Sequence, residues 1–155
     1  MRYKSLFPTN KQDADNRKLR GGYYTPLELA QYLVKWGIRD DTERILEPSC
    51  GDGNFILAIL QHLADMPGLS PSITAVELIP DELKKAQARV KRFGQNGTEI
   101  DWLHQDFFEA YNYLRQNCRF NFIVGNPPFI RFQYFDDDSR NLAFSHFIHG
   151  HFCKT

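Results

Sequence analysis

The sequence lacks the features of membrane, secreted and strongly charged proteins. None of its apolar runs approaches the ~20 residues that a membrane span needs, and its start, MRYKSLFPTN, has no apolar stretch typical of a signal peptide. Its 155 residues include 19 Lys and Arg and 19 Asp and Glu, so the formal net charge is zero. This balance excludes a histone-like polycation, although a local nucleic-acid-binding surface remains compatible with it. We expect a cytoplasmic protein without a membrane partner.

Cysteine and metal-binding patterns are also scarce. The cysteines are widely scattered and form neither a disulfide framework nor a zinc motif (Cys50, Cys118 and Cys153). We interpret them as packing residues. Three histidines lie close together without a carboxylate or cysteine partner at a matching spacing (His146, His149 and His151). The sequence therefore predicts no metal site.

Short apolar segments alternate with longer segments of helical periodicity. We expect strands over residues 44–46, 72–77, 99–103 and 120–124, and helices over 26–37, 54–66, 80–93, 107–117 and 138–149. Strands separated by helices of ~10–15 residues predict a parallel sheet with right-handed crossovers. The expected fold class is therefore α/β, a Rossmann-like, doubly wound and mostly parallel sheet.

Two helices illustrate the expected packing. In the first, Thr25 is a candidate cap and Pro26 suits the first helical position. Its large apolar residues fall on one face (Leu29, Leu33 and Trp36). In the second, over residues 54–66, four residues are expected to point inward (Ile56, Ile59, Leu60 and Leu63).

Residues 1–22 are polar and basic. We interpret them as an arm that is either solvated or in contact with a phosphate backbone.

The loops that follow the strands carry the chemistry, because ligands of open α/β sheets bind beyond the carboxyl ends of the strands. The first loop reads Glu47-Pro48-Ser49-Cys50-Gly51-Asp52-Gly53. It matches neither the dinucleotide fingerprint nor the P-loop. Its glycines allow a close approach of the backbone to a ligand. Its acidic residues favour a ligand with a positive centre and free hydroxyls over a phosphate.

Two further carboxylates stand at strand ends. Glu77 closes the second strand, where a carboxylate is placed to accept hydrogen bonds from ribose hydroxyls. Asp106 and Phe107 follow the third strand. This pair can bond an adenine amine and cover its ring, but an Asp that caps the next helix explains the pattern equally well.

The fourth strand is followed by Asn126-Pro127-Pro128-Phe129. The Asn side-chain carbonyl and an adjacent backbone carbonyl form two fixed acceptors, and the prolines stiffen the turn without adding competing donors. Two acceptors aimed at one planar amine hold both of its hydrogens and favour tetrahedral nitrogen, which frees the lone pair for attack. Phe129 can stack on the ring that bears the amine.

Together these motifs resemble the class I S-adenosylmethionine-dependent methyltransferases, and more narrowly the adenine-specific DNA methyltransferases of restriction–modification and phage-defence systems. The resemblance covers roughly residues 20–145 and follows the gamma order of motifs. Gly22-Tyr23-Tyr24-Thr25-Pro26 is similar to motif X, residues 47–53 to motif I, and Ala75-Val76-Glu77-Leu78 to motif II. Residues 105–107 are similar to motif III and residues 126–129 to the catalytic motif IV.

The resemblance implies a role for each motif. S-adenosylmethionine would be bound by residues of motifs X, I, II and III (Tyr24, Thr25, Glu47, Pro48, Ser49, Cys50, Gly51, Gly53, Glu77, Leu78, Asp106 and Phe107). The catalytic residues would be Asn126, Pro127, Pro128 and Phe129. Asn126 and the Pro127 carbonyl would grip the N6 amine of an adenine flipped out of double-stranded DNA, and Phe129 would stack on that base. Neither a metal nor a covalent enzyme intermediate is needed.

Two alternatives and one departure accompany this reading. A protein-glutamine methyltransferase shares the Asn-Pro-Pro-aromatic motif, and a non-catalytic cofactor-binding remnant fits the first loops alone. The departure is length, because the family needs about three more strands and a target-recognition region after motif IV. We therefore expect residues 23–155 to form a methyltransferase domain with only the first four strands, truncated after motif IV. Such a chain would be inactive alone and would need the remaining part of the methyltransferase or a specificity subunit.

Overall fold

The computed structural model of the chain describes residues 24–95, 97–128 and 141. Its elements in chain order are α2 (Leu27–Gly37), β1 (Arg44–Glu47), α3 (Asn54–Ala64), β2 (Ser72–Glu77), α4 (Pro80–Phe93), β3 (Ile100–His104), α5 (Phe107–Asn117) and β4 (Phe122–Ile123). The basic arm, Phe129, Cys153, the three grouped histidines and nearly all of the expected helix over 138–149 lie outside the described residues.

The four strands form one parallel sheet in the order β3-β2-β1-β4. Arg44 of β1 is opposite Ser72 of β2, Ile45 is opposite Phe122 of β4, and Ile73 of β2 is opposite Ile100 of β3. The chain first moves outward from β1 to β3 and then returns to the other side of β1. The strand order therefore reverses between β1 and β4, and this is the point at which open α/β sheets bind ligands.

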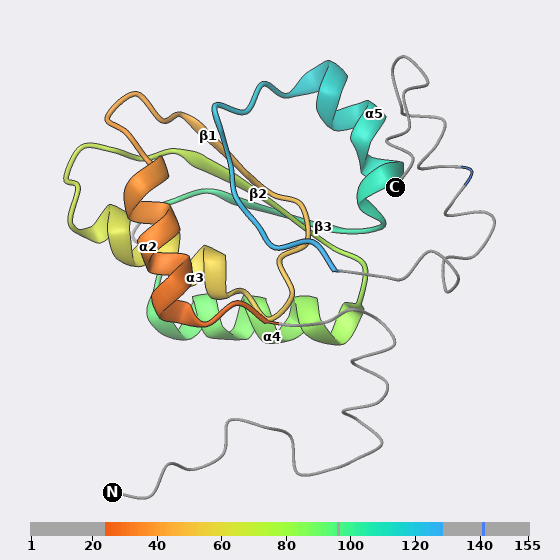
Figure 1. Ribbon diagram of the computed structural model, residues 1–155, viewed down its shortest axis with the longest axis horizontal. Helices are drawn as coiled ribbons and strands as arrows, with labels where there is room; N and C mark the ends of the chain where they lie inside the picture. The colour runs from red at the N-terminus through yellow and green to blue at the C-terminus, as the bar shows by residue number, and fades with distance from the viewer. Residues whose placement is uncertain (1–23, 96, 129–140, 142–155) are drawn as a thin grey trace, which may run out of the picture.

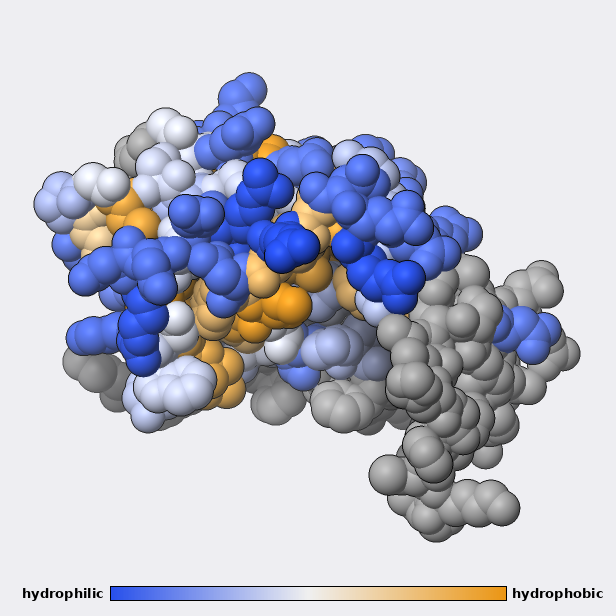
Figure 2. Space-filling model, turned by 90° about the horizontal axis from the view of Figure 1, so that it is seen from above, coloured by the Kyte–Doolittle hydropathy of each residue, from blue (hydrophilic) through white to orange (hydrophobic). Residues whose placement is uncertain are grey.

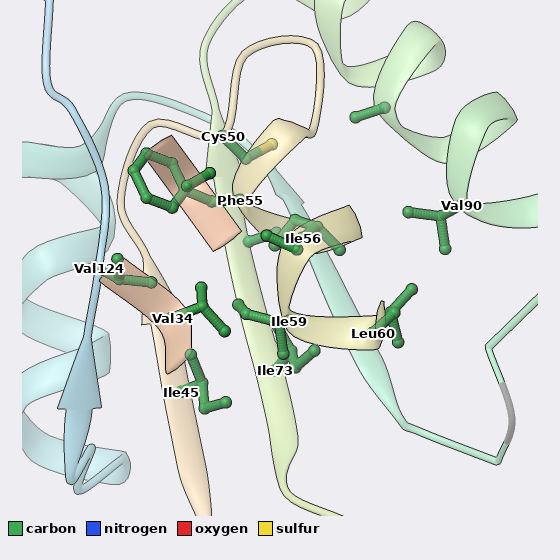
Figure 3. Close-up of a cluster of buried hydrophobic side chains, with 14 of the residues drawn as sticks. Val34, Ile45, Cys50, Phe55, Ile56, Ile59, Leu60, Ile73, Val90 and Val124 are labelled. Carbon is green, nitrogen blue, oxygen red and sulfur yellow. The ribbon is translucent and has the colours of Figure 1, made fainter. Parts of the chain in front are cut away.

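Helices cover both faces of the sheet (Figure 1). On one face, α2, α3 and α4 bury the larger core, in which Val34, Ile45 and Val124 join α2, β1 and the end of β4 (Figure 3). On the other face, Leu46 and Val76 pack against Ala110 and Leu114 of α5. Adjacent residues of β1 thus point into different cores, as expected for a parallel sheet that is buried on both sides.

The predicted fold class is confirmed, and most element bounds agree with the expected ones. The strand over 72–77 and the helices over 80–93 and 107–117 have the bounds that the sequence predicted. The helix expected over 54–66 ends at Ala64, and all four of its inward residues are buried. Hydrophobic periodicity and breakers such as Pro80 and Gly94 were sufficient here because each helix has a long apolar face.

The orientation of α2 differs from its sequence pattern. Its buried residues are the small Ala30 and Val34, whereas the large residues on the neighbouring face are exposed (Leu29 50%, Tyr32 70%, Leu33 36% and Trp36 70%). The close approach of α2 to the sheet explains this choice. A Cβ on Gly37 would overlap the ring of Phe122, so only small side chains fit between α2 and β4.

Two local expectations were wrong or only partly right. Thr25 does not cap α2, because the N-cap is Pro26 and no side chain bonds the first amides. Thr25 is instead buried next to the first loop. The strand expected over 120–124 is regular only at Phe122–Ile123, although backbone bonds from Asn121 to Arg44 and from Val124 to Leu46 continue the pairing on either side.

Within residues 24–95 and 97–128, no helix is long and apolar enough to cross a membrane.

The orientation of α2 can be tested by two substitutions. Val34→Ala removes a fully buried side chain and should reduce the free energy of unfolding by about 2 kcal/mol. Trp36→Ala removes a much larger but 70% exposed side chain and should change it by less than about 0.5 kcal/mol. Denaturant unfolding of both variants measures the difference. A larger loss for Trp36→Ala would show that the apolar face seen in the sequence is the packed one.

Candidate cofactor and catalytic site

The loops named in the sequence analysis converge at one edge of the sheet. Glu47 closes β1 opposite Ala75, and Glu77 closes β2 opposite His104 of β3. Because all strands are parallel, the segments that follow them leave the sheet on the same side. The residues predicted to bind a cofactor and a substrate amine are therefore brought together by topology.

The first loop is held tightly against the neighbouring elements. Its Cys50 N–H donates to the carbonyl of Val76 at 2.9 Å, and its Gly53 N–H donates to the carbonyl of Cys50 at 2.8 Å. Gly53 has φ 86°, and a Cβ there would lie 2.9 Å from the Cβ of Ala86 in α4. This position accepts only glycine for two reasons, its left-handed backbone and the close packing of α4.

Arg89 of α4 holds the same loop from outside. Its Nη1 donates to Asp52 Oδ2 at 2.6 Å and to the Asp52 carbonyl at 2.9 Å, and its Nη2 donates to Asn54 Oδ1 at 2.7 Å. Burial raises the pKa of Asp52, whereas the neighbouring Arg89 guanidinium acts in the opposite direction. The sequence analysis missed Arg89, since nothing in its local pattern marks it and only the fold brings α4 to the loop.

The segment before α2 also contacts the first loop. Asn54 Nδ2 donates to the carbonyl of Thr25 at 2.9 Å. The ring of Tyr24 lies beside Gly51, where a Cβ would be 3.2 Å from its Cε1. Tyr24 is 39% exposed. The structure thus brings Tyr24 and Thr25 next to the loop, and their contact with a cofactor stays a prediction.

Glu77 is buried and already oriented by the backbone. Its Oε2 accepts from the Gly51 N–H at 2.7 Å, and its Oε1 accepts from the Ile79 N–H at 2.8 Å. Each carboxylate oxygen has a further lone pair available for another donor. Leu78 follows as a 58% exposed side chain, and its carbonyl accepts from His104 Nε2 at 3.1 Å.

Asp106 caps α5, which is one of the two roles that the sequence left open. Its Oδ1 accepts from the Phe108 N–H at 2.7 Å. Phe107 is partly buried against the core around Leu46 and Val76, and its ring meets that of Tyr111 edge-on with centroids 6.3 Å apart. This cap does not conflict with adenine binding, because a carboxylate has two oxygens.

Glu47 is the most buried acid of the site. It is 0% exposed, its Oε1 accepts from the Ser49 N–H at 3.0 Å, and its buried Oε2 has no hydrogen-bond partner in the described part of the chain. Burial raises the pKa of Glu47 to about 8, with the Ser49 amide opposing this shift and Glu77 adding to it. Burial and the two glutamates also raise the pKa of the Cys50 thiol, which supports the interpretation of Cys50 as a packing residue.

The segment after β4 meets the first loop at Glu47. A Cβ on Gly125 would overlap Glu47 Oε1 and would lie 3.1 Å from Pro48 Cδ. Asn126, Pro127 and Pro128 come next and are exposed. The predicted substrate motif is therefore adjacent to the predicted cofactor loop, and its last member, Phe129, lies outside the described residues.

Two hollows of the described surface lie elsewhere. One of about 410 Å³ is lined by Gln87, Lys91 and Trp102, and another of about 590 Å³ by Lys35, His62 and Met66. Neither contains a residue of the strand-end loops. Within the described residues, no group of His, Cys, Asp and Glu is arranged to hold a metal ion.

The comparison with known proteins agrees with these motifs. A profile of the N-6 DNA methylase family matches residues 7–150. The chain belongs to the N-6 DNA methylase family. The type II methyltransferase M.PaeR7I of Pseudomonas aeruginosa is 30% identical over 134 residues, covering 72% of this chain and 23% of that protein. M.BstVI of Geobacillus stearothermophilus is 25% identical over 148 residues, covering 78% of this chain and 26% of that protein.

Solved structures support the fold alone. A modification subunit of a putative type I restriction enzyme from Vibrio vulnificus YJ016 has a TM-score of 0.57 at 20% identity, covering 86% of this chain and 32% of that one. A methyltransferase from Agrobacterium tumefaciens has a TM-score of 0.50 at 16% identity, covering 65% and 30%. The family predicted from the motifs is thus confirmed, and the chain spans about a quarter of the length of the type II relatives that it matches.

The buried carboxyl of Glu47 makes the stability of the protein depend on pH. Its pKa is about 8 in the folded chain and 4.5 in the unfolded chain, so the folded state binds more protons between these values. Stability should therefore fall as the pH rises from about 4.5 to 8. Glu47→Gln mimics the protonated acid and should equal the wild type near pH 4, below the unfolded pKa, while exceeding it in stability above pH 8. Thermal unfolding across this range tests the sign, with Glu43→Gln, an exposed acid, as the control.

Proposed function

We propose that this chain carries the cofactor-binding and catalytic motifs of an enzyme that transfers a methyl group from S-adenosylmethionine to the N6 amine of adenine in DNA. The restriction–modification context of its relatives supports the same role for the whole protein. One observation carries the proposal. Gly125, next to Asn126, packs directly on Glu47 of the first loop, so the amine-binding and cofactor-binding motifs meet where the strand order reverses.

The cofactor assignment is supported by the position and charge of the loop residues. Glu77 is fixed by two backbone amides at the end of β2, as a ribose-binding carboxylate requires. Asp106 and Phe107 follow β3, where an adenine would lie. Glu77 supplies a carboxylate close to the first loop, which suits the sulfonium and the amino group of the methyl donor.

The reaction step depends on placement. The Asn126 side-chain carbonyl and the Pro127 carbonyl would accept hydrogen bonds from both N–H groups of the adenine amine, and the freed lone pair would attack the sulfonium methyl in line. The carbon–nitrogen bond would form as the carbon–sulfur bond breaks, the neutral thioether would leave, and the methylated amine would lose one proton to solvent. Proximity and orientation supply most of the rate enhancement in such a transfer. Flipping the base out of the duplex costs a few kcal/mol, which stacking partly returns.

Two other functions share some of these features. A protein-glutamine methyltransferase would use the Asn-Pro-Pro loop on a side-chain amide, and a remnant would bind the cofactor without transferring its methyl group. The match to the N-6 DNA methylase family favours DNA. Transfer of a labelled methyl group to unmethylated DNA rather than to protein distinguishes the first alternative, and binding without any transfer identifies the second.

The remaining part of the methyltransferase is the proposed partner. The outer side of β4 carries no strand among the described residues, and Ile123 at this edge is 61% exposed. The exposed apolar residues of α2, such as Leu33 and Trp36, lie near the same β4 edge, because Gly37 at the end of α2 packs on Phe122 of β4. On the face of the molecule where α5 lies, hydrophobic residues are exposed among polar side chains (Figure 2). Such an edge favours association, and we expect the 155-residue chain alone to leave DNA unmethylated.

The ribose role of Glu77 predicts a loss of cofactor affinity. Glu77→Ala removes charged hydrogen bonds and should weaken S-adenosylmethionine binding by roughly 1.5–3 kcal/mol. Calorimetry on the chain measures this change. Glu99→Ala, an exposed acid at the other end of the sheet, is the matched control and should leave the affinity unchanged. Equal affinities for the Glu77 variant and the wild type would remove Glu77 from the site.

The role of Asn126 predicts a separation of binding from chemistry. In an active methyltransferase that contains this chain, Asn126→Ala should abolish methyl transfer to DNA and leave cofactor binding largely unchanged, since Asn126 would face the substrate amine. Single-turnover transfer of a labelled methyl group measures the rate. A rate within tenfold of the wild type, about 1.4 kcal/mol in activation free energy, contradicts the assignment.

A further inference from the structure

The Glu47 carboxyl occupies an unusual position in the site. It is fully buried at the end of β1, between the first loop and the segment that leads to Asn126. Ser49 holds Oε1 from the loop side, and Gly125 closes over the same oxygen from the β4 side. The carboxyl therefore lies at the boundary between the cofactor motif and the substrate motif.

The other oxygen, Oε2, is buried and has no hydrogen-bond partner in the described part of the chain. A buried carboxylate with an unsatisfied oxygen is costly, so the neutral acid is favoured unless a positive group comes near. Among the described residues, Glu77 of β2 disfavours a second negative charge at Glu47, and the neighbouring Cys50 thiol stays neutral because burial and the same glutamates raise its pKa.

No cation of the described chain balances this charge. The guanidinium of Arg89 is engaged by Asp52 and Asn54 on the outer side of the loop. Residues 122–128 contain no ionisable side chain. Among the described residues, nothing therefore offsets an ionised Glu47, and a cationic ligand at the strand ends would make that form favourable.

We propose that Glu47 responds to the charge of the bound cofactor: it releases a proton to solvent when the cationic methyl donor binds, and takes a proton back when the donor becomes the neutral thioether. This inference rests on the proposed function, because it takes S-adenosylmethionine as the ligand. Methyl transfer removes the positive charge of the sulfonium, so the same carboxyl stabilises the donor and not the product. Glu47 is thus a residue that distinguishes substrate from product.

The raised pKa of Glu47 is consistent with this cycle, since it leaves the carboxyl mostly protonated at pH 7 without a ligand. Reprotonation of Glu47 after methyl transfer would lower the affinity for S-adenosylhomocysteine and favour its exchange for S-adenosylmethionine. Because Gly125 packs on the Glu47 carboxyl, the change in charge also alters the electrostatic environment next to Asn126.

Calorimetry on the full chain at pH 7 tests the proposal through the number of protons exchanged. The ligands are S-adenosylmethionine, the neutral S-adenosylhomocysteine, and a cationic analogue with an amine in place of the sulfonium. Each is titrated in two buffers of different ionisation enthalpy. We expect both cations to release up to about one proton more than the neutral product. Equal proton release for all three ligands overturns the proposal without any variant being needed.

Variants then assign the proton to its residue. Glu47→Gln keeps the shape of the side chain, and it should abolish the extra proton release and bring the affinities for donor and product together. Glu77→Gln should weaken all three ligands alike, because they share the ribose, and should keep the extra release. Extra release that persists in Glu47→Gln overturns the proposal. Failure of the wild-type chain to bind either donor or product contradicts the proposed function itself, and this inference with it.

Discussion

The packing of Gly125 on the buried Glu47 carboxyl is the contact on which the site depends. It spans the point between β1 and β4 where the strand order reverses, and it leaves no room for a side chain at residue 125. The φ of Gly125 is not in the left-handed region, so glycine is required there by space and not by conformation. Through this contact, the segment that carries Asn126 takes its position from the end of β1.

The other acidic residues of the site also accept hydrogen bonds from backbone amides in the ligand-free protein. Glu77 accepts from the amides of Gly51 and Ile79, and Asp106 accepts from the amide at the start of α5. These hydrogen bonds fix the orientation of the carboxylates and the conformation of the loops. Ligand binding therefore costs little further side-chain and loop entropy. Arg89 completes the arrangement by joining α4 to the first loop. The site is therefore built on the sheet and the helices packed on it, which gives more precise placement than loops alone.

Most of the fold and the convergence of the strand-end loops could be predicted from the sequence, because each rests on a local signal. Alternating apolar segments and breakers identified the strands and helices, and topology alone brings strand-end loops together. The orientation of α2 could not be predicted, since the choice of Ala30 and Val34 over Leu29 and Trp36 depends on how closely α2 approaches Phe122. The hydrogen bonds of Arg89 to Asp52 and Asn54, and the burial of Glu47, could not be predicted for the same reason. They depend on residues far apart in the chain, and no local pattern marks them.

A cofactor that binds at the carboxyl ends of the strands should perturb only one edge of the sheet, which a two-dimensional NMR titration of the labelled chain with S-adenosylmethionine can measure. We expect amide shifts at the strand-end loops, for example at Gly51, Ile79 and Gly125. Amides at the opposite ends of the strands, such as those of Thr42, Ser72 and Thr98, should stay unchanged. Shifts centred on that opposite edge, or an unchanged spectrum at saturating cofactor, would show that the strand-end loops are not the cofactor site.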